Sequence, residues 1–184
     1  MSDTVYIVLF RGVGGKTQLP TAPLREKLAE AGFRNVATYI NSGNALVKTR
    51  KSRATAAKEI AAICKREFGF EKDIYLISAE EWDAVIANNP FPDATETPKF
   101  LHAAWLTDAP DPARLKALQD IAQGRDRIEV VGNVAYLHTP AGFGTSKLAE
   151  RFDKGIGVPN TARNWNTVLK LAELADKCAG ATLP

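Results

Sequence analysis

The pattern of apolar and polar positions divides the first half of the chain into short alternating strands and helices. Residues 4–10, TVYIVLF, contain no polar residue after Thr4, which predicts a central strand buried on both faces. Residues 21–31 place two leucines one helical turn apart and stop before Gly32, which predicts a helix that ends at a glycine. The other predicted elements of this half are strands at 35–40, 45–49 and 73–77, helices at 52–68 and 79–87, and a hairpin turn at 41–44.

The same order of elements recurs after a segment without periodicity. Residues 88–99, NNPFPDATETPK, contain three prolines, which favours a connector. Beyond it we expect strands at 100–106, 127–131 and 134–138, and helices at 111–123, 146–154 and 164–177. In the last helix the expected apolar stripe consists of Trp165, Val168, Leu169 and Ala172. The predicted units are therefore 1–90 and 99–184, joined by a connector at 88–98, and we expect them to unfold as one cooperative whole.

This order predicts an α+β protein with two successive β-α-β-β-α units. Each unit is expected to form an antiparallel, ferredoxin-like sheet, and C-terminal helices close the chain. The first unit reads as β-α-β-β-α-β and the second as β-α-β-β-α-α. In such a sheet the first strand lies beside the third. The loop at 11–18 should therefore face the hairpin turn at 41–44.

The loop at 11–18, RGVGGKTQ, combines positive charge with glycine. Glycines leave backbone N–H groups uncovered, and Arg11 and Lys16 add the charge that suits a phosphate or carboxylate. We therefore predict that the loop and the facing turn bind a small anionic, nucleotide or phosphorylated ligand, and that Arg11 serves this site and not the fold. The candidate residues are Arg11, Gly12, Gly14, Gly15, Lys16, Asn41, Ser42 and Asn44.

Two better-known phosphate motifs do not fit this loop. The residues GGKT at 14–17 suggest the phosphate loop of nucleoside-triphosphate hydrolases, but that motif needs a glycine where Phe10 stands. Pro20 and Pro23 also prevent a helix from starting directly after the lysine. The dinucleotide motif GxGxxG fails because Thr17 occupies the place of its third glycine. A glycine turn with anion-binding amides is the better interpretation.

Charge and strand composition argue against specific recognition of nucleic acid. RNA-recognition domains stack bases on aromatic residues of their first and third strands, and residues 45–48, ALVK, supply none. Residues 31–58 carry six lysines and arginines and no acid, whereas 67–96 carry eight acids and one lysine. These flanks are either solvated helix faces or a surface that orients a charged partner. Nonspecific contact with nucleic acid through the basic run at 48–58 is kept as an alternative.

The residues with metal-binding or catalytic chemistry form no recognisable constellation. His102 and His138 are expected near one edge on neighbouring strands, but no third ligand can be named, so a zinc site is not predicted. Cys64 and Cys178 lie far apart and are interpreted as buried thiols. No catalytic triad or nucleophile turn is present in the sequence pattern. No catalytic residue is therefore assigned, and any cofactor is unknown.

The expected location is the cytoplasm, without a membrane partner. The first residues lack a basic segment, and the apolar run at 5–10 is too short for a signal peptide core or a membrane span.

Four separated motifs resemble the family known as domain of unknown function 1697, DUF1697. They are YIVLFRGVGGK, TYINSGN, YLHTPAGFGTSKL and TARNWNTVLKLAELA, which occur in the family's order between about residues 5 and 175. The resemblance implies a bacterial cytosolic protein with an α+β fold of two related halves, and it brings no settled activity, cofactor or substrate. Lys147, Arg163 and Asn164 match the family pattern and join the candidate site residues on that ground.

The chain departs from the family pattern at two places. The family's glycine loop is usually longer, with an asparagine between RG and GG, and its usual glutamine before SGN is Asn41 here. If this loop holds a ligand, we therefore expect this chain to hold it differently or more weakly. The segment 161–167 also carries more polar side chains than one helix cap requires, so Arg163 and Asn164 need partners either in the fold or in a ligand.

The leading prediction is a binding module for a small anion, nucleotide or phosphorylated molecule. The alternative is a structural or protein-interaction domain, in which the same motifs are turns and helix caps and the charged flanks meet another protein. An enzyme comes third, because the sequence supplies no recognisable general base or nucleophile.

Overall fold

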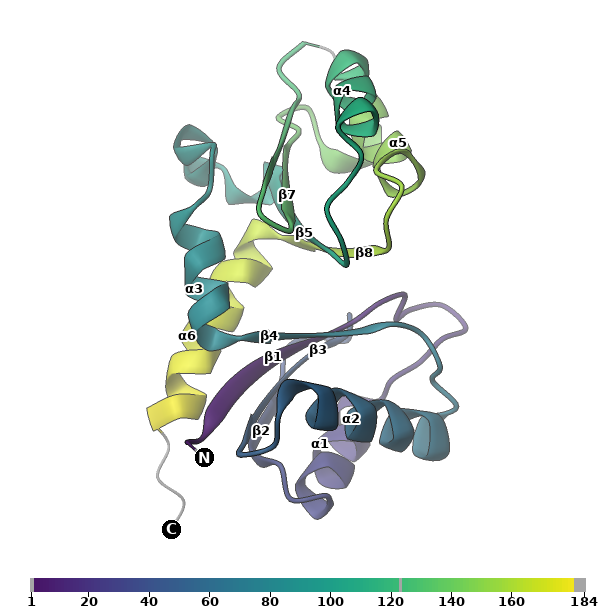
Figure 1. Ribbon diagram of the computed structural model, residues 1–184, viewed down its shortest axis with the longest axis vertical. Helices are drawn as coiled ribbons and strands as arrows, with labels where there is room; N and C mark the ends of the chain where they lie inside the picture. Colours follow the sequence, from purple (N-terminus) through teal and green to yellow (C-terminus); the bar gives the residue numbers. More distant parts are fainter. Residues whose placement is uncertain (1, 123, 181–184) are drawn as a thin grey trace. The chain divides into compact units, whose positions relative to one another are not determined.

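The computed structural model describes residues 2–122 and 124–180, which form an α+β structure with two four-stranded antiparallel sheets (Figure 1). The chain divides into two compact units. Unit 1 comprises Met1–Ala84 and Lys170–Pro184, and unit 2 comprises Val85–Leu169. The predicted fold class, α+β with two antiparallel sheets, is confirmed.

Unit 1 is built on a sheet with the strand order β2-β3-β1-β4. This order places the first strand beside the third, as expected, and is consistent with the ferredoxin-like arrangement. The strands are β1 (Thr4–Phe10), β2 (Arg34–Thr38), β3 (Asn44–Thr49) and β4 (Ile74–Ser78). The helices are α1 (Thr21–Glu30), α2 (Arg53–Phe68) and α3 (Ala79–Ala87), the last of which runs into unit 2.

The continuous apolar run of β1 is buried on both faces of the sheet. On one face Tyr6, Val8 and Phe10 join a core with residues of α1 and α2, and Figure 1 shows both helices on that side of the sheet. On the other face Ile7 and Leu9 have no exposed surface. A strand buried in this way has no position for a polar side chain, which explains its composition.

Unit 2 repeats the arrangement with the strand order β6-β7-β5-β8. The strands are β5 (Leu101–Leu106), β6 (Arg127–Val131), β7 (Val134–His138) and β8 (Asn160–Asn164). Its helices are α4 (Pro112–Ile121) and α5 (Lys147–Gly155), and it contains the start of α6 (Trp165–Gly180), which belongs to unit 1 from Lys170 onward. The expected end of the helix at 111–123, Gln123, lies outside the described residues. The described residues of the unit also form the short 3-10 helices η1 (Pro92–Glu96), η2 (Pro98–Phe100) and η3 (Phe143–Thr145).

The strand β8 is the main correction to the predicted elements. Residues 161–164 were expected at a helix entrance, but they pair antiparallel with β5, with Arg163 opposite Ala103 and Thr161 opposite Trp105. Unit 2 is therefore β-α-β-β-α-β, followed by α6. The strand escapes detection because it lies at the sheet edge and reads NTARN, without the β-branched alternation that signals a strand.

The buried stripe of α6 also differs from the expected one. Trp165 and Val168 are buried, as predicted, but Leu169 has 44% of its surface exposed. The other buried apolar residues of the helix are Leu171, Ala175 and Cys178, and the polar Thr167 is buried as well. The stripe thus follows steps of three and four residues from Trp165, and the adjacent leucine at 169 falls outside it.

Cys64 and Cys178 are both buried and free, as expected. Burial raises the pKa of the Cys64 thiol to about 12, so this side chain stays protonated and packs as a small apolar group. Within residues 2–122 and 124–180, none of the helices has the length and apolar content to cross a membrane.

Truncation after Pro98 should leave an unstable or aggregating fragment. Unit 1 includes the second half of α6, where the carbonyl of Cys178 accepts a hydrogen bond from Asn35 Nδ2 at 2.8 Å, and that of Ala179 accepts one from Lys48 Nζ at 2.8 Å. Fragment 1–98 loses these contacts with β2 and β3. A domain of this size is only marginally stable, so the loss should be enough to unfold it. Circular dichroism should show no cooperative thermal transition. A soluble fragment 1–98 that melts cooperatively would contradict this expectation.

Candidate functional site

The loop at 11–18 and the turn at 41–44 lie together at one edge of the sheet of unit 1. The backbone N–H of Phe10 donates to the carbonyl of Gly43 at 2.9 Å, and that of Arg11 donates to the carbonyl of Asp73 at 3.0 Å. The loop therefore begins between the hairpin turn and the start of β4. This is the juxtaposition that the strand order predicted.

The approach of the turn to the loop requires a glycine at position 43. Gly43 has φ +81, and a Cβ atom there would lie 2.7 Å from the carbonyl oxygen of Phe10 and 2.9 Å from Cγ2 of Val13. Backbone atoms cannot move away from such a contact as a flexible side chain could. Any larger residue at position 43 would push the turn off the loop.

The loop itself closes as a tight hairpin. The backbones of Gly14 and Thr17 exchange two hydrogen bonds, with N···O distances of 2.7 and 2.9 Å. Gly15 and Lys16 form the exposed tip, and Gln18 Nε2 donates to the carbonyl of Gly15 at 2.6 Å. The charge of Lys16 is thereby held at the outer end of an ordered turn.

Lys72 joins this edge, although sequence analysis did not assign it to the site. A Cβ atom on Gly12 would lie 3.2 Å from Lys72 Nζ, so the ammonium group lies against the backbone of the glycine. Gly12 has φ +69, a conformation that favours glycine. The loop therefore carries or contacts three cationic side chains, those of Arg11, Lys16 and Lys72.

Residues of the turn divide into exposed and structural ones. Asn41 and Ser42 are exposed, whereas Asn44 is buried, and its Nδ2 lies 3.2 Å from both the Tyr39 carbonyl and Ser42 Oγ. Asn44 thus uses its amide group to hold the turn. Directly before the turn, Ile40 adopts φ +49, which is a strained backbone conformation for a β-branched residue. Its side chain is exposed, with 52% of the residue surface accessible.

The other three predicted site residues belong to unit 2. Lys147 is exposed at the first position of α5. Arg163 donates from Nη1 to Thr161 Oγ1 at 2.7 Å and to the Ala162 carbonyl at 2.8 Å, and burial lowers the pKa of its guanidinium to about 10. Arg163 therefore has partners within the fold.

Asn164 likewise has structural partners. Its Nδ2 donates to the carbonyl of Lys99 at 2.9 Å, and its Oδ1 accepts from the backbone N–H of Asn166 at 3.0 Å. It ties the end of β8 to η2 and satisfies an amide at the start of α6.

The two histidines do not form a ligand pair. His102 pairs with Leu137, and His138 pairs with Leu101. Because neighbouring residues of a strand point to opposite faces, the two imidazoles lie on opposite sides of the sheet. Across the described residues there is also no group of three or more His, Cys, Asp or Glu that could hold a metal ion.

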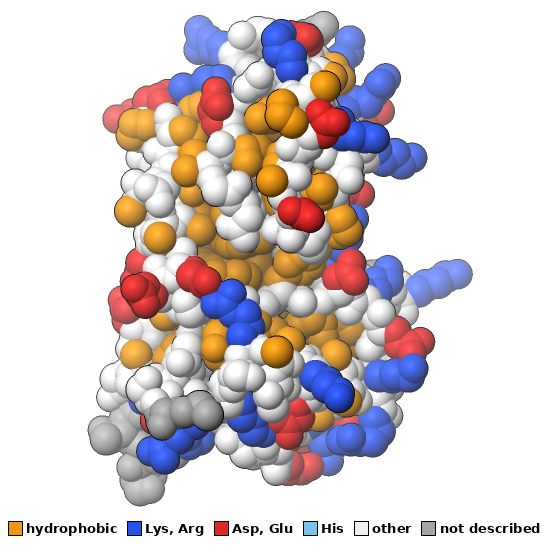
Figure 2. Space-filling view, in the orientation of Figure 1, with side chains coloured by type: hydrophobic (Ala, Val, Ile, Leu, Met, Phe, Trp, Pro, Cys, Tyr) orange, Lys and Arg blue, Asp and Glu red, His pale blue; other side chains and the backbone are white. Residues whose placement is uncertain are grey.

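The basic run at 31–58 is largely paired with carboxylates. Arg34 contacts Asp3, Lys51 contacts Glu59, and Arg53 Nη2 lies 2.7 Å from Glu81 Oε2. Figure 2 shows lysine and arginine side chains interspersed with acidic ones on the visible face. This pairing weakens the field that a nucleic acid would meet.

Unit 2 contains a hollow that was not predicted from the sequence. It is lined by residues between α3 and β5, by the start of β6 with the two residues that line it just before, and by the end of β7 with Pro140 beyond it. These segments come together only in the folded unit.

The family comparison covers the glycine loop, the turn and most of both sheets. Residues 4–136 match the family model described as "Protein of unknown function (DUF1697)". The chain belongs to this family. Within this DUF1697 protein, Lys147, Arg163 and Asn164 lie beyond the matched residues.

Among the solved structures that match is one with the same fold as this DUF1697 protein. It is "conserved bacterial protein SP0830 from Streptococcus pneumoniae", with 22% sequence identity and a TM-score of 0.75, covering 95% of this chain and 99% of that chain. None of the curated proteins matches the chain.

Proposed function

We propose that this DUF1697 protein is a cytosolic binding module for a small anionic, nucleotide or phosphorylated ligand, which it holds at the 11–18 loop and the 41–44 turn. The observation that carries the proposal is the combination of charge and open backbone at this loop. Arg11, Lys16 and Lys72 supply three cations on or against it. This density of positive charge on a short glycine loop favours an oxyanion.

The backbone of the loop supplies further donors. Within the described part of the chain, the N–H groups of Gly12, Gly15 and Lys16 have no hydrogen-bond acceptor. Glycine at 12 and 15 leaves these amides without a shielding side chain. An anion at the loop would accept from such amides and from the neighbouring cationic groups, as in other backbone anion sites.

The proposed location and partners follow from the same residues. Two buried free thiols are typical of proteins from reducing compartments, which supports the cytosol. The carboxylate partners of the basic run disfavour specific binding to nucleic acid. We propose no membrane partner and assign no catalytic step to this edge.

Arg11→Ala should abolish ligand binding and change the melting temperature of the free protein little. Inorganic phosphate, nucleotides and sugar phosphates would be added to the wild-type chain in a thermal-shift screen, and one class is expected to raise its melting temperature. Arg11→Ala and Lys72→Ala should lose that shift because each removes a cation from the site. Lys58→Ala removes a charge from an exposed position of α2 and should keep it.

A different result would assign Arg11 to the fold. If Arg11→Ala melts clearly lower both with and without the stabilising anion, its guanidinium serves mainly to fix the loop. Loss of the shift in Lys58→Ala as well would mean that the anion acts through general charge and not through this edge.

A structural or protein-interaction domain is the second candidate function. Ile40 favours it, because a strained apolar residue with 52% exposure stands beside the turn, and exposed apolar side chains are common anchors of protein contacts. Under this function no anion shifts the melting temperature, and a partner co-purifies at fixed stoichiometry. Ile40→Ser would then release that partner.

A further inference from the structure

The hollow in unit 2 has the size and polar lining of a small-molecule site, and it is independent of the proposed site in unit 1. Its volume is about 470 Å³, which lies within the usual range of ligand pockets. Its lining includes Asp93, Thr97, Arg125, Arg127, His138 and Pro140. The lining contains two arginines and one carboxylate, so its net charge is positive.

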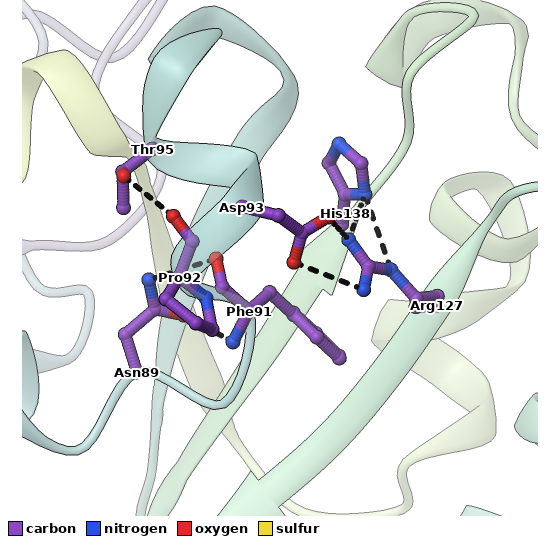
Figure 3. A network of polar contacts seen from close by, with 7 residues as sticks. All are labelled: Asn89, Phe91, Pro92, Asp93, Thr95, Arg127 and His138. Atoms are coloured by element: carbon purple, nitrogen blue, oxygen red, sulfur yellow. Dashed lines mark hydrogen bonds and ion pairs between the residues drawn. The ribbon is translucent and has the colours of Figure 1, made fainter.

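Arg127 lines the hollow and is held in place by polar contacts, which Figure 3 shows. Its Nη1 and Nη2 donate to the two carboxylate oxygens of Asp93 at 3.2 and 2.6 Å. Its guanidinium carbon lies 4.5 Å from the centre of the Phe91 ring. The guanidinium holds the pKa of the Asp93 carboxyl below its ordinary value, so the pair stays charged. Most of the donors of Arg127 are thus already used in fixing its position.

His138 is oriented by Arg127 so that it presents a donor. Arg127 Nη2 lies 2.9 Å from His138 Nδ1, and Arg127 Nε lies 3.3 Å from the same atom. Because a guanidinium only donates, Nδ1 accepts and the ring proton is carried by Nε2. Burial and the nearby Arg127 lower the pKa of His138, which favours this neutral form. Figure 3 shows the second ring nitrogen directed away from Arg127.

Arg125 is the uncommitted cation of the hollow. It is exposed, and it forms no hydrogen bond or ion pair with any other described residue. Its planar guanidinium therefore keeps its donors for a ligand, in the fork that matches the oxygens of a phosphate or carboxylate. The hollow thus offers a ligand the guanidinium of Arg125 and the imidazole N–H of His138, which Arg127 holds in place.

We propose that this hollow binds a small organic phosphate, whose oxygens accept from Arg125 and from Nε2–H of His138 while a ligand hydroxyl donates to Asp93. A phosphate monoester offers three acceptor oxygens. That number suits a guanidinium fork together with an imidazole donor better than the two oxygens of a carboxylate. Asp93 is 66% exposed at its side chain and keeps lone pairs for a hydroxyl group, and Pro140 adds an apolar surface for the ligand body.

The two histidines of the chain make a direct test possible. The imidazole signals of the full-length protein would be followed by NMR while ribose 5-phosphate is added, and a His138→Gln variant would assign them. His138 should shift in a saturable manner, whereas His102, on the opposite face of the sheet, should not. Ribose without the phosphate should have no effect, and inorganic phosphate should bind more weakly than the ester.

Arg125→Ala should raise the dissociation constant at least about tenfold, the loss expected for a charged hydrogen bond. Arg151→Ala, which removes an exposed arginine of α5 outside the hollow, should leave it unchanged. The proposal is overturned if His138 shows no saturable shift, or if Arg125→Ala binds as tightly as wild type. Equal affinity for inorganic phosphate and the ester would overturn the assignment of an organic ligand.

Discussion

Replacing Trp165 by alanine should lower the free energy of unfolding by about 3–5 kcal/mol. The indole has only 1% of its surface exposed, and its ring lies 6.3 Å from that of Tyr136. Tyr136 in turn donates from its hydroxyl to the carbonyl of Val85 at 2.7 Å. The truncation leaves a cavity beside a ring held by this hydrogen bond, so the surroundings have little freedom to collapse into it.

Urea unfolding followed by far-ultraviolet circular dichroism measures the effect without relying on the lost fluorophore. Leu169→Ala is the matched control, because it truncates a residue of the same helix that is exposed and lies outside the buried stripe. It should cost less than about 1 kcal/mol. If Trp165→Ala melts close to wild type but no longer binds a stabilising ligand, the tryptophan is a binding residue and its structural assignment is wrong.

Acidification from about pH 7 to pH 4 should remove about 3 kcal/mol of stability through His102 alone. Burial lowers the pKa of this imidazole from 6.5 to about 4. Its Nδ1 is buried without a partner, and its ring stacks on Phe143 at 4.1 Å. Between these two pKa values the unfolded state binds a proton that the folded state does not. The folded state is therefore favoured above pH 6.5 and loses this contribution as the pH falls toward 4.

The comparison with His102→Asn isolates this contribution from that of the carboxylates. Asp3 and Glu173, whose pKa values are lowered by cationic partners, are present in both proteins and affect both curves. The difference in unfolding free energy between pH 7 and pH 4 should be smaller in the variant by about 3 kcal/mol. Identical pH dependence, or an imidazole of His102 that titrates near pH 6.5 in the folded protein, would contradict the expectation.

The elements with strong periodicity could be predicted because their packing depends on local pattern. The uninterrupted apolar run of β1 predicted a central strand, and the strand order then placed the 11–18 loop against the turn at 41–44. The hydrogen bond from Phe10 to Gly43 shows that contact. Topology alone was sufficient here, because both segments are attached directly to paired strands.

Other parts of the fold could not be predicted, because their residues are placed by tertiary contacts. The strand β8 lies at the edge of its sheet and pairs only with β5. Its residues are mostly polar, so the sequence resembles a helix entrance more than a strand. Likewise, nothing near Lys72 in the sequence places its ammonium against Gly12. Lys72 reaches the loop at 11–18 only because β4, which begins two residues after it, pairs with β1.

The hollow of unit 2 illustrates the same limit for a site. Asp93 comes from a proline-rich connector, Arg127 from β6 and His138 from the end of β7. Each residue alone has an ordinary structural interpretation. Their hydrogen bonds to one another appear only in the folded unit, and they supply the chemical argument for a ligand.

The most direct test of the proposed function is a titration of the 15N-labelled full-length protein, followed by the backbone amide signals of the 11–18 loop. Inorganic phosphate, a nucleotide and a sugar phosphate would be added in separate experiments. At least one of them should shift the amides of Gly12, Gly15 and Lys16 in a saturable manner, and Arg11→Ala should lose this response. If these amides do not respond to any of the three anions, the glycine loop is not an anion-binding site and the proposed function is wrong.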